Sequence, residues 1–432
     1  MGELENGKKD RRIIVEGISG DCKPFGVGDR YRNGCCGDRR WACGNIDSIF
    51  SGAGRKKVYC TGADRIGSGQ TANTTAKALR QEYRAASELG LPAELKENSE
   101  LPFPVEAVLQ FTDQASFHPL KFLKQMAEKV CVFEQTKVMR AEPHLLVTNR
   151  GRVCAKQIVF ACHYPFVLRP GYYFLRMHQE RSYVIGVKNA PVIQGMYLGI
   201  DPDGISLRPA GEVLLFGGGK HRTGDGKQGN SYEYLMHEAE KYFGEVQVKY
   251  QWSAQDCMTL DKIAYIGQFG KSTEDWFVAT GFQKWGMTSS MAGALILTDL
   301  MCGRSNPYAE VFSPQRLNVL ASAKTFLEEG KYAAVNLAKE KMMVPKEKLE
   351  SISRETGGVV EHEGQKVGIY KAEDGAIYAV SVKCPHLGCQ LAWNQAEKSW
   401  DCPCHGSRYD YRGRLLDGPA QTTSAACQLH EK

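Results

Sequence analysis

The sequence predicts a mixed α/β chain that ends in a small all-β domain. Residues 275–282 form an apolar stretch that ends at a glycine, and residues 286–301 continue as small and apolar residues, a pattern typical of a strand, a turn and a helix. Short strand-like stretches separated by Gly and Pro fill residues 165–250 and predict an antiparallel sheet. Near the end of the chain, alternating stretches at residues 366–370 and 377–382 predict strands only.

The composition is that of a globular protein with two or three domains. A chain of 432 residues suffices for several cores, and 42% hydrophobic with 24% charged residues is an ordinary balance. The net charge of +6 is spread along the chain, which predicts no nucleic-acid partner. No stretch approaches the roughly 18 apolar residues of a membrane span, and the polar start lacks the apolar core of a signal peptide. We therefore expect a cytoplasmic chain without a transmembrane segment.

Two short boxes near the end of the chain combine Cys and His. The first reads CPHLGC over residues 384–389, and the second reads CPCHGS over residues 402–407. Two tight loops of this kind can present two thiolates and two imidazoles to one site, which is the ligand set of a Rieske [2Fe–2S] centre. A structural zinc site is the alternative, because zinc also takes Cys and His in fours. The C-x-H and C-x-C-H spacings favour the cluster, since zinc fingers use C-x2-C and H-x3-H pairs.

The two boxes resemble those of the disulfide-bearing branch of the Rieske family. The two remaining cysteines, Cys389 and Cys404, fall at equivalent places in the two loops, and the resemblance implies a bridge between them. The resemblance also implies that Ser407 and Tyr409 donate hydrogen bonds to cluster or ligand sulfur, which raises the potential of the cluster. The implied metal ligands are Cys384, His386, Cys402 and His405.

Two other stretches resemble FAD-dependent oxidoreductases of the D-amino-acid-oxidase-like family, which have a Rossmann-like FAD/NAD(P)-binding fold and an antiparallel substrate sheet. Residues 63–77 resemble the segment after the second strand of that family, and residues 281–288 resemble its second FAD contact, at a helix N-terminus. The alternative for residues 281–288 is a tight turn with a buried Trp. The implied FAD-binding residues are Ser68, Thr71, Asn73, Gly281, Lys284, Trp285, Gly286, Met287 and Thr288.

The N-terminal segment, residues 1–62, is atypical for this family. Residues 10–60 predict no regular element, and the G-x-G-x-x-G turn that holds the FAD pyrophosphate is absent. When the codons of residues 34–50 are read one nucleotide forward, they permit Val-Ala-Val-Ile-Gly-Gly-Gly-Leu-Ala-Gly. The same shift at residues 59–62 permits Ile-Val-Leu and then, with one nucleotide lost, Glu, the acid that binds ribose. This favours a frameshift over a divergent N-terminus. The family usually has more chain after residue 77, and a deletion there is one of two interpretations, the other being a shorter segment.

These patterns together predict the domain organisation. We expect the oxidoreductase domain at residues 63–315 with its substrate sheet at 165–250, a helical connector at 316–350 and the Rieske domain at 351–432. Glycines 217–219 predict a tight turn, since no helix follows them. Further elements are expected as helices at 79–89 and 118–130 and strands at 102–112, 132–138, 145–148 and 158–162.

The resemblance implies an oxidoreductase with two redox cofactors. A C–H bond next to an amine or hydroxyl of a small-molecule substrate gives a hydride to FAD, and single electrons pass to the cluster and then to an acceptor. His178, Arg181 and Tyr183 are candidates to face the substrate, with packing as the alternative. The other hypothesis is a one-electron carrier or inactive remnant that holds only the cluster, because the sequence lacks the nucleotide turn.

Overall fold

The computed structural model describes residues 12–14, 55–62, 70–201, 203–225, 229–316, 331–332, 335 and 349–427, with the backbone alone for 12–14, 55–62 and 70–76. The chain divides into two compact units. The first consists of Met1–Ala42, His118–Arg176 and Thr259–Phe326, and the second of Cys43–Phe117, Met177–Met258 and Leu327–Lys432. Each unit combines segments that are far apart in the sequence, so the units do not correspond to the predicted domains. The predicted domain boundaries therefore stay predictions. Most of the predicted connector lies outside the described residues.

A three-stranded sheet and a helix form the centre of the first unit. The sheet has the order β14-β15-β8, with β15 antiparallel to β14 and parallel to β8. Gly281, at φ +70°, turns the chain after β15 toward α4, so the predicted strand, turn and helix are confirmed. Ile296 and Leu297 of α4 pack with Ile266 and Phe277 of the sheet. The elements are β8 (Ile158–Phe160), β14 (Tyr265–Gln268), β15 (Trp276–Thr280) and α4 (Gly286–Met301).

The other elements of the first unit, among its described residues, are a second small sheet and short helices. The sheet has the order β1-β7-β6-β5. The strand expected at 132–138 is wrong, because β5 begins only at Val138 and the preceding residues form turns. The bounds are β1 (Arg12–Ile14), β5 (Val138–Glu142), β6 (Leu145–Thr148), β7 (Gly151–Cys154), α2 (Pro119–Ala127), the 3-10 helix Tyr173–Leu175 and α5 (Ala309–Phe312).

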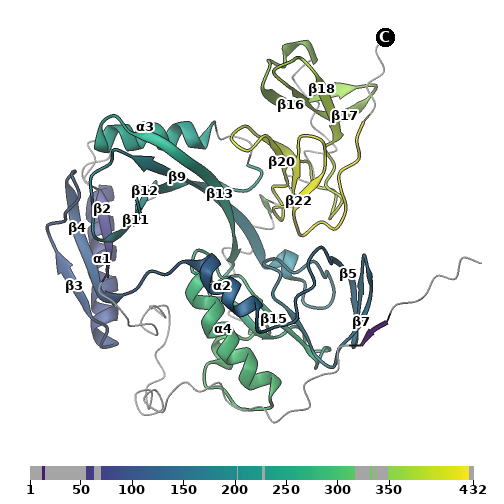
Figure 1. Cartoon of the computed structure of the whole chain (residues 1–432), viewed down its shortest axis with the longest axis horizontal. Coiled ribbons are helices and arrows are strands. Elements are labelled where there is room, and N and C mark those ends of the chain that lie inside the picture. The colour runs from purple at the N-terminus through teal and green to yellow at the C-terminus, as the bar shows by residue number, and fades with distance from the viewer. Residues whose placement is uncertain are drawn as a thin grey trace, which may run out of the picture. The chain divides into compact units, whose positions relative to one another are not determined.

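An eight-stranded sheet organises the second unit, in the order β13-β9-β12-β11-β10-β2-β4-β3. Figure 1 shows β9 and β13 as long curved strands with α3 lying across the sheet. Its elements are β2 (Arg55–Gly62), α1 (Gln70–Glu88), β3 (Ala93–Lys96), β4 (Val105–Gln114), β9 (Met177–Lys188), β10 (Met196–Gly199), β11 (Ser206–Ala210), β12 (Val213–Arg222), α3 (Ser231–Phe243) and β13 (Gln247–Thr259).

Three expectations for this region need correction. β1 and β2 are strands inside the segment for which no regular element is predicted, and backbone pairing of β2 with β4 and β10 explains why a sequence without an apolar run is extended there. The helix α1 begins nine residues earlier than expected. The glycines 217–219 lie inside β12 and not in a turn, and Gly219, at φ +60°, stands where the register of β12 against β9 shifts.

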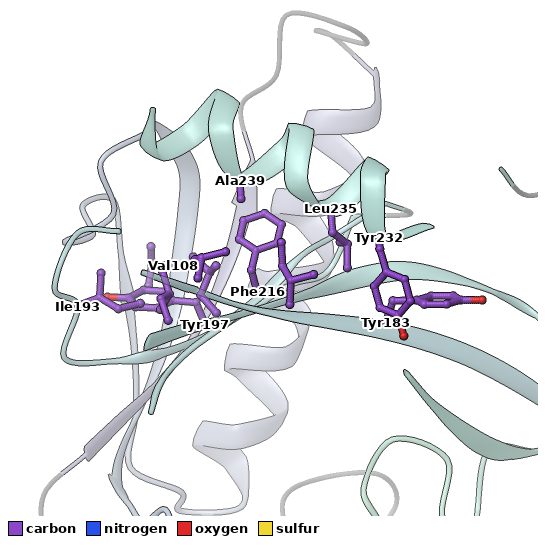
Figure 2. Packing of buried hydrophobic residues seen from close by; sticks show 12 residues of the cluster. Val108, Tyr183, Ile193, Tyr197, Phe216, Tyr232, Leu235 and Ala239 are labelled. Carbon is purple, nitrogen blue, oxygen red and sulfur yellow. The ribbon is translucent and has the colours of Figure 1, made fainter. Parts of the chain in front are cut away.

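The core of this unit lies between α3 and the sheet (Figure 2). Asn230 caps α3 by accepting a hydrogen bond of 3.2 Å from the backbone N–H of Tyr232. Leu235 and Ala239, four residues apart on one face of the helix, are fully buried and pack in one cluster with Phe216 of β12. Burying a leucine side chain of this kind contributes about 1.5–3 kcal/mol. This packing holds β9 and β12 in a fixed position.

Residues 349–427, which the structure describes without a gap, form strands and one 3-10 turn. Two antiparallel sheets have the orders β16-β17-β18 and β19-β20-β21-β22. Trp400 and Tyr409 are directly opposite on β20 and β21, and both are fully buried. A Cβ at Gly368 would stand 2.8 Å from the Trp400 ring, so the close packing requires glycine there. The strands are β16 (Thr356–His362), β17 (Gln365–Lys371), β18 (Ile377–Ser381), β19 (Ala392–Asn394), β20 (Ser399–Asp401), β21 (Arg408–Asp410) and β22 (Leu415–Asp417), after a 3-10 turn at Leu349–Ser351.

Candidate metal centre and cofactor contacts

The two Cys/His boxes fold into loops with the same hydrogen bonds. In each loop the N–H of the first residue donates to the carbonyl of the sixth, and the N–H of the fifth donates to the carbonyl of the first. The fifth residues, Gly388 and Gly406, have φ of +83° and +80°, a region that favours glycine. The bonds are Cys384 N to Cys389 O at 2.9 Å, Gly388 N to Cys384 O at 2.9 Å, Cys402 N to Ser407 O at 2.8 Å and Gly406 N to Cys402 O at 2.9 Å.

A disulfide joins Cys389 to Cys404, with an S–S distance of 2.02 Å. The predicted bridge is confirmed, but the expectation that its cysteines occupy equivalent places is wrong. The shared hydrogen-bond pattern makes Cys389 equivalent to Ser407, and it makes Cys404 equivalent to His386. The reason is that the second box carries its histidine one residue later than the first. The bridge therefore links unlike positions of two like loops.

The remaining cysteines and histidines of the boxes come together as two pairs. The Cys384 and Cys402 side chains are 2% and 1% exposed and hydrogen-bond to each other. The Nδ1 atoms of His386 and His405 lie 3.3 Å apart. Two imidazole nitrogens at about 2.0–2.1 Å from one tetrahedral metal ion, the range known for zinc, stand about 3.4 Å apart. One sulfur pair and one nitrogen pair fit a cluster in which two Cys hold one iron and two His the other.

The protonation states of Cys384 and His386 suit metal binding, whereas Cys402 has to release its proton when a metal binds. The pKa of the Cys384 thiol is lowered, first by the hydrogen bond from Cys402 and then by the backbone N–H of His386. The pKa of Cys402 is raised in turn, because it donates to the Cys384 thiolate and is buried. Burial lowers the pKa of His386 to about 4, which keeps its imidazole neutral. Thiolate and neutral imidazole are the forms that bind metals.

Three cysteine sulfur atoms lie close together in these loops, but only one of them can be a metal ligand. The sulfur atoms of Cys389, Cys402 and Cys404 all lie within 4.8 Å of one another. Two of these three are joined in the disulfide, so only Cys402 has a thiol to offer. The chemistry of the donor set thus selects the pairs described above.

Two hydroxyl groups surround the Cys384 sulfur. The Tyr409 hydroxyl lies 3.6 Å from it, and burial raises the pKa of Tyr409, so the phenol keeps its proton. The Ser407 hydroxyl accepts a hydrogen bond of 3.0 Å from the backbone N–H of Ala420 and interacts with the same sulfur. Both positions suit the predicted donors, whose role toward a bound cluster stays a prediction.

The three candidates on β9 make contacts within the second unit. Arg181, only 2% exposed, lies 3.3 Å from Glu397, measured from Nη2 to Oε2. The Tyr183 hydroxyl accepts a hydrogen bond of 2.9 Å from the Asn394 side chain. His178 lies 3.7 Å from the Glu180 carboxylate, which is also on β9. Arg181 and Tyr183 therefore contact the hairpin of residues 392–401, which is the packing role that the alternative predicts.

The turn between β15 and α4 carries the expected second FAD contact. Trp285 and Met287 are 39% and 54% exposed, so the alternative of a buried Trp is wrong. Gly286, the first residue of α4, has open space where a Cβ would stand. Lys284 is exposed and Thr288 half-buried beside them. An open helix N-terminus with exposed apolar side chains fits a flavin nucleotide, since its N–H groups point outward.

The residues expected at the first FAD contact lie largely outside the described side chains. Ser68 and the residues read out of frame, 34–50, lie outside the described residues. Thr71 and Asn73 lie in the backbone of α1, and their side chains are not described. The fit to FAD thus rests on the second contact, the turn at residues 281–288.

Two family profiles match the chain. The FAD dependent oxidoreductase profile (DAO) matches residues 55–300, more than half of the chain, and the Rieske [2Fe-2S] domain profile matches residues 341–428. The chain belongs to the FAD-dependent oxidoreductase family. This oxidoreductase is 35% identical over 393 residues to YhfW of Bacillus subtilis, which is named as a Rieske 2Fe-2S iron-sulfur protein. The aligned residues cover 87% of this chain and 77% of YhfW. The two domains of this chain imply FAD and a [2Fe–2S] cluster as cofactors.

Further similarities concern single parts of the oxidoreductase. The chloroplastic iron-sulfur subunit of the cytochrome b6-f complex of Arabidopsis thaliana is 48% identical over 50 residues, which is 12% of this chain and 22% of that protein. Glycine oxidase from Geobacillus kaustophilus superimposes with a TM-score of 0.48 at 18% identity, over 61% of this chain and 75% of that chain. Among the described residues, no helix has the length and apolar character needed to cross a membrane.

Sequence reasoning missed the side chains of the sheet that contact the second box. Gln179, Arg222 and Gln255 each bind its backbone across more than 150 positions of the chain. No sequence signal marks them, because a polar residue at every second position of a strand is also the pattern of a solvent-exposed face. Only the burial of Gln179, which is 1% exposed, separates the two cases.

Proposed function

We propose that this oxidoreductase takes electrons from a small substrate with an amine or hydroxyl group and passes them through FAD to a [2Fe–2S] cluster. The proposed ligands are Cys384 and Cys402 for one iron and His386 and His405 for the other. One observation carries the proposal. The two cysteine sulfurs form one pair and the two histidine Nδ1 atoms, 3.3 Å apart, form another, in two loops that the disulfide links. When bound, FAD supplies hydride acceptance and the cluster supplies one-electron transfer.

The chain's own residues bind and orient these groups. The open N-terminus of α4 and the turn before it offer backbone N–H groups to the flavin nucleotide. The buried cluster loops exclude water from the sulfur ligands, since every residue of 401–410 is buried. The first loop differs, because Pro385 and Leu387 are exposed around the half-buried His386. We propose that an electron acceptor, a protein or a small molecule, approaches this loop.

Metal analysis tests the cluster. Protein purified without oxygen should contain about two irons per chain and show a potential between about −150 and +300 mV. Cys402→Ser should lose the iron, whereas Cys427→Ser, which changes a free cysteine of the same domain, should keep it. Stoichiometric zinc without iron in the wild-type protein would contradict the proposal.

A second function is favoured by the sequence before residue 63. Because the G-x-G-x-x-G turn is absent there in the given frame, the chain can be a one-electron carrier that holds the cluster alone. Flavin absorption in the purified protein, together with bleaching of the cluster by candidate amines and hydroxy acids, separates the two functions. Bound flavin favours the oxidoreductase proposal, and its absence favours the carrier.

The other expectations on partners and place are proposals as well. We propose a cytoplasmic protein without a nucleic-acid partner, supported by the evenly spread net charge of +6. We also propose residues 63–315 as the oxidoreductase domain and 351–432 as the Rieske domain, joined by a connector at 316–350. Cell fractionation and limited proteolysis with mass spectrometry test these points.

A further inference from the structure

Four successive backbone carbonyls of the second cluster loop each accept a hydrogen bond from a side chain of the eight-stranded sheet. The donors come from three adjacent strands, β9, β12 and β13, which lie within the same compact unit as the loop. The bonds are Arg222 Nε to Pro403 O at 3.1 Å, Arg222 Nη2 to Cys404 O at 3.4 Å, Gln179 Nε2 to His405 O at 2.7 Å and Gln255 Nε2 to Gly406 O at 3.1 Å.

The loop and the sheet also fit together without space between them. A Cβ at Gly406 would stand 2.7 Å from the Cβ of Gln179, and a Cβ at Gly224 would stand 2.6 Å from the carbonyl carbon of Cys402. Glycine on both surfaces thus lets the backbones approach. Such contact excludes water from the carbonyls, which strengthens the hydrogen bonds they accept.

The two glutamines hold each other in place. Gln255 Nε2 lies 2.8 Å from Gln179 Oε1, and Gln255 Oε1 accepts a hydrogen bond of 3.0 Å from the Thr223 hydroxyl. Gln255 Nε2 also lies 3.0 Å from the Asp417 carboxylate. Its two protons can therefore bond to only two at a time of three acceptors, which are Gln179 Oε1, the Gly406 carbonyl and this carboxylate. Gln179 and Thr223 are each 1% exposed. Amides that are bonded through both their oxygen and their nitrogen have one orientation, and they fix the loop that they bind.

Arg222 differs from the glutamines because it carries a charge. Its guanidinium donates to two carbonyls in the loop between the proposed ligands Cys402 and His405. A nearby positive charge favours the state of a metal site that has gained an electron, since that state is more negative.

We propose that Gln179, Gln255 and Arg222 form a carbonyl clamp, which holds the cluster loop on the sheet, and that Arg222 raises the reduction potential of the site from outside the Rieske domain. The inference rests on the proposed function, because it needs the cluster in the two loops. All three are positioning residues, since they act on the site through the backbone of residues 403–406.

Charge variants of Arg222 test the clamp in the full chain. Arg222→Gln removes the charge, Arg222→Lys keeps it, and Arg208→Gln is the matched control, because Arg208 is an exposed residue of β11 in the same sheet. Iron content and the midpoint potential, followed by electron paramagnetic resonance, are measured for each. Arg222→Gln should keep its iron and shift the one-electron reduction equilibrium about tenfold toward the oxidised state, which is about 59 mV. Arg222→Lys should shift it less, and Arg208→Gln should not shift it.

Hydrogen exchange of the peptide that contains residues 402–407 gives a second readout. Gln179→Leu removes the amide at similar volume and should speed exchange in this peptide, while peptides of β16 and β17 stay unchanged. Wild-type protein without iron would overturn the proposed function and this inference with it. Iron-containing protein in which Arg222→Gln matches Arg208→Gln in potential, or in which Gln179→Leu leaves exchange unchanged, would overturn the clamp alone.

Discussion

The hydroxyl oxygen of Tyr409 lies 3.6 Å from the sulfur of Cys384, across 25 positions of the chain. Tyr409 is fully buried in β21, opposite Trp400, so its ring has no freedom to leave the sulfur. The raised pKa of Tyr409, caused first by burial and then by the thiol, keeps the hydroxyl a donor. This fixed donor supports a role in tuning a sulfur ligand.

Removing this hydroxyl should therefore lower the cluster potential. Tyr409→Phe and Ser407→Ala each delete one donor that spreads the charge of the reduced state, and neither deletes a proposed ligand. We expect both variants to retain iron and to show a lower midpoint potential in redox titrations. Tyr411→Phe is the control, because its ring packs on Tyr370 and Tyr378 in the same domain. Equal potentials in all variants would show that the two hydroxyls only pack.

The disulfide should stabilise the cluster loops. Cys389→Ser releases the link between two loops that are otherwise separate, and loss of a native disulfide commonly costs about 2–5 kcal/mol. We expect faster loss of iron in air than in wild-type protein, measured by absorbance, with Cys427→Ser unchanged. Intact-protein mass spectrometry that finds both thiols free while the cluster persists would contradict this.

A buried ion pair should decide the stability of the first unit. Arg316 binds both oxygens of Asp261 at 2.7 and 2.8 Å, and these side chains are 11% and 3% exposed. Arg316→Met leaves a buried carboxylate without its partner and should cost about 3–5 kcal/mol in the free energy of unfolding. Arg304→Met breaks the more exposed pair with Asp299 and should cost about 1 kcal/mol or less, measured by denaturant unfolding. If the two substitutions lowered the free energy of unfolding equally, the prediction would be wrong.

The same pair predicts a pH dependence. Burial alone would raise the pKa of Asp261, but the hydrogen bonds and charge of Arg316 outweigh it, and the pKa is lowered. A carboxyl with a lowered folded pKa stabilises fully above its ordinary value of about 3.9 and loses that contribution as pH falls through the folded value. Asp261→Asn should thus differ most from wild type at neutral pH and converge with it in acid. A constant difference at all pH values would be the contrary result.

The chain in the given frame should bind FAD more weakly than a chain with the complete nucleotide turn. Its second contact at residues 281–288 is in place, but the pyrophosphate needs a glycine turn that residues 34–50 do not encode. Restoring the shifted frame, with Ile-Gly-Gly-Gly-Leu-Ala-Gly and Ile-Val-Leu-Glu before Ala63, should recover flavin binding, provided that a deletion after Lys77 is tolerated. Stoichiometric flavin released from the unmodified chain by heat would refute both the weaker binding and the frameshift.

Local patterns in the sequence sufficed for several parts of the structure. The strand, turn and helix of β15 and α4 were predictable because their hydrogen bonds span a few residues and Gly281 marks the turn. Each cluster loop closes on itself within six residues, so the types and spacing of its ligands are readable in CPHLGC and CPCHGS. The sequence by itself thus determined which chemistry the C-terminal domain carries.

Only the tertiary structure decided where these parts make contact. The alignment of the two loops, with Cys404 in the place of His386, follows from hydrogen bonds and not from residue types. The strand β2 is extended because its backbone pairs with β4 and β10, and no apolar run in the sequence predicts this strand. Gln179 and Arg222 bind carbonyls more than 180 positions away. Such contacts depend on burial, and a polar side chain looks the same in the sequence whether water or a backbone carbonyl accepts its hydrogen bond.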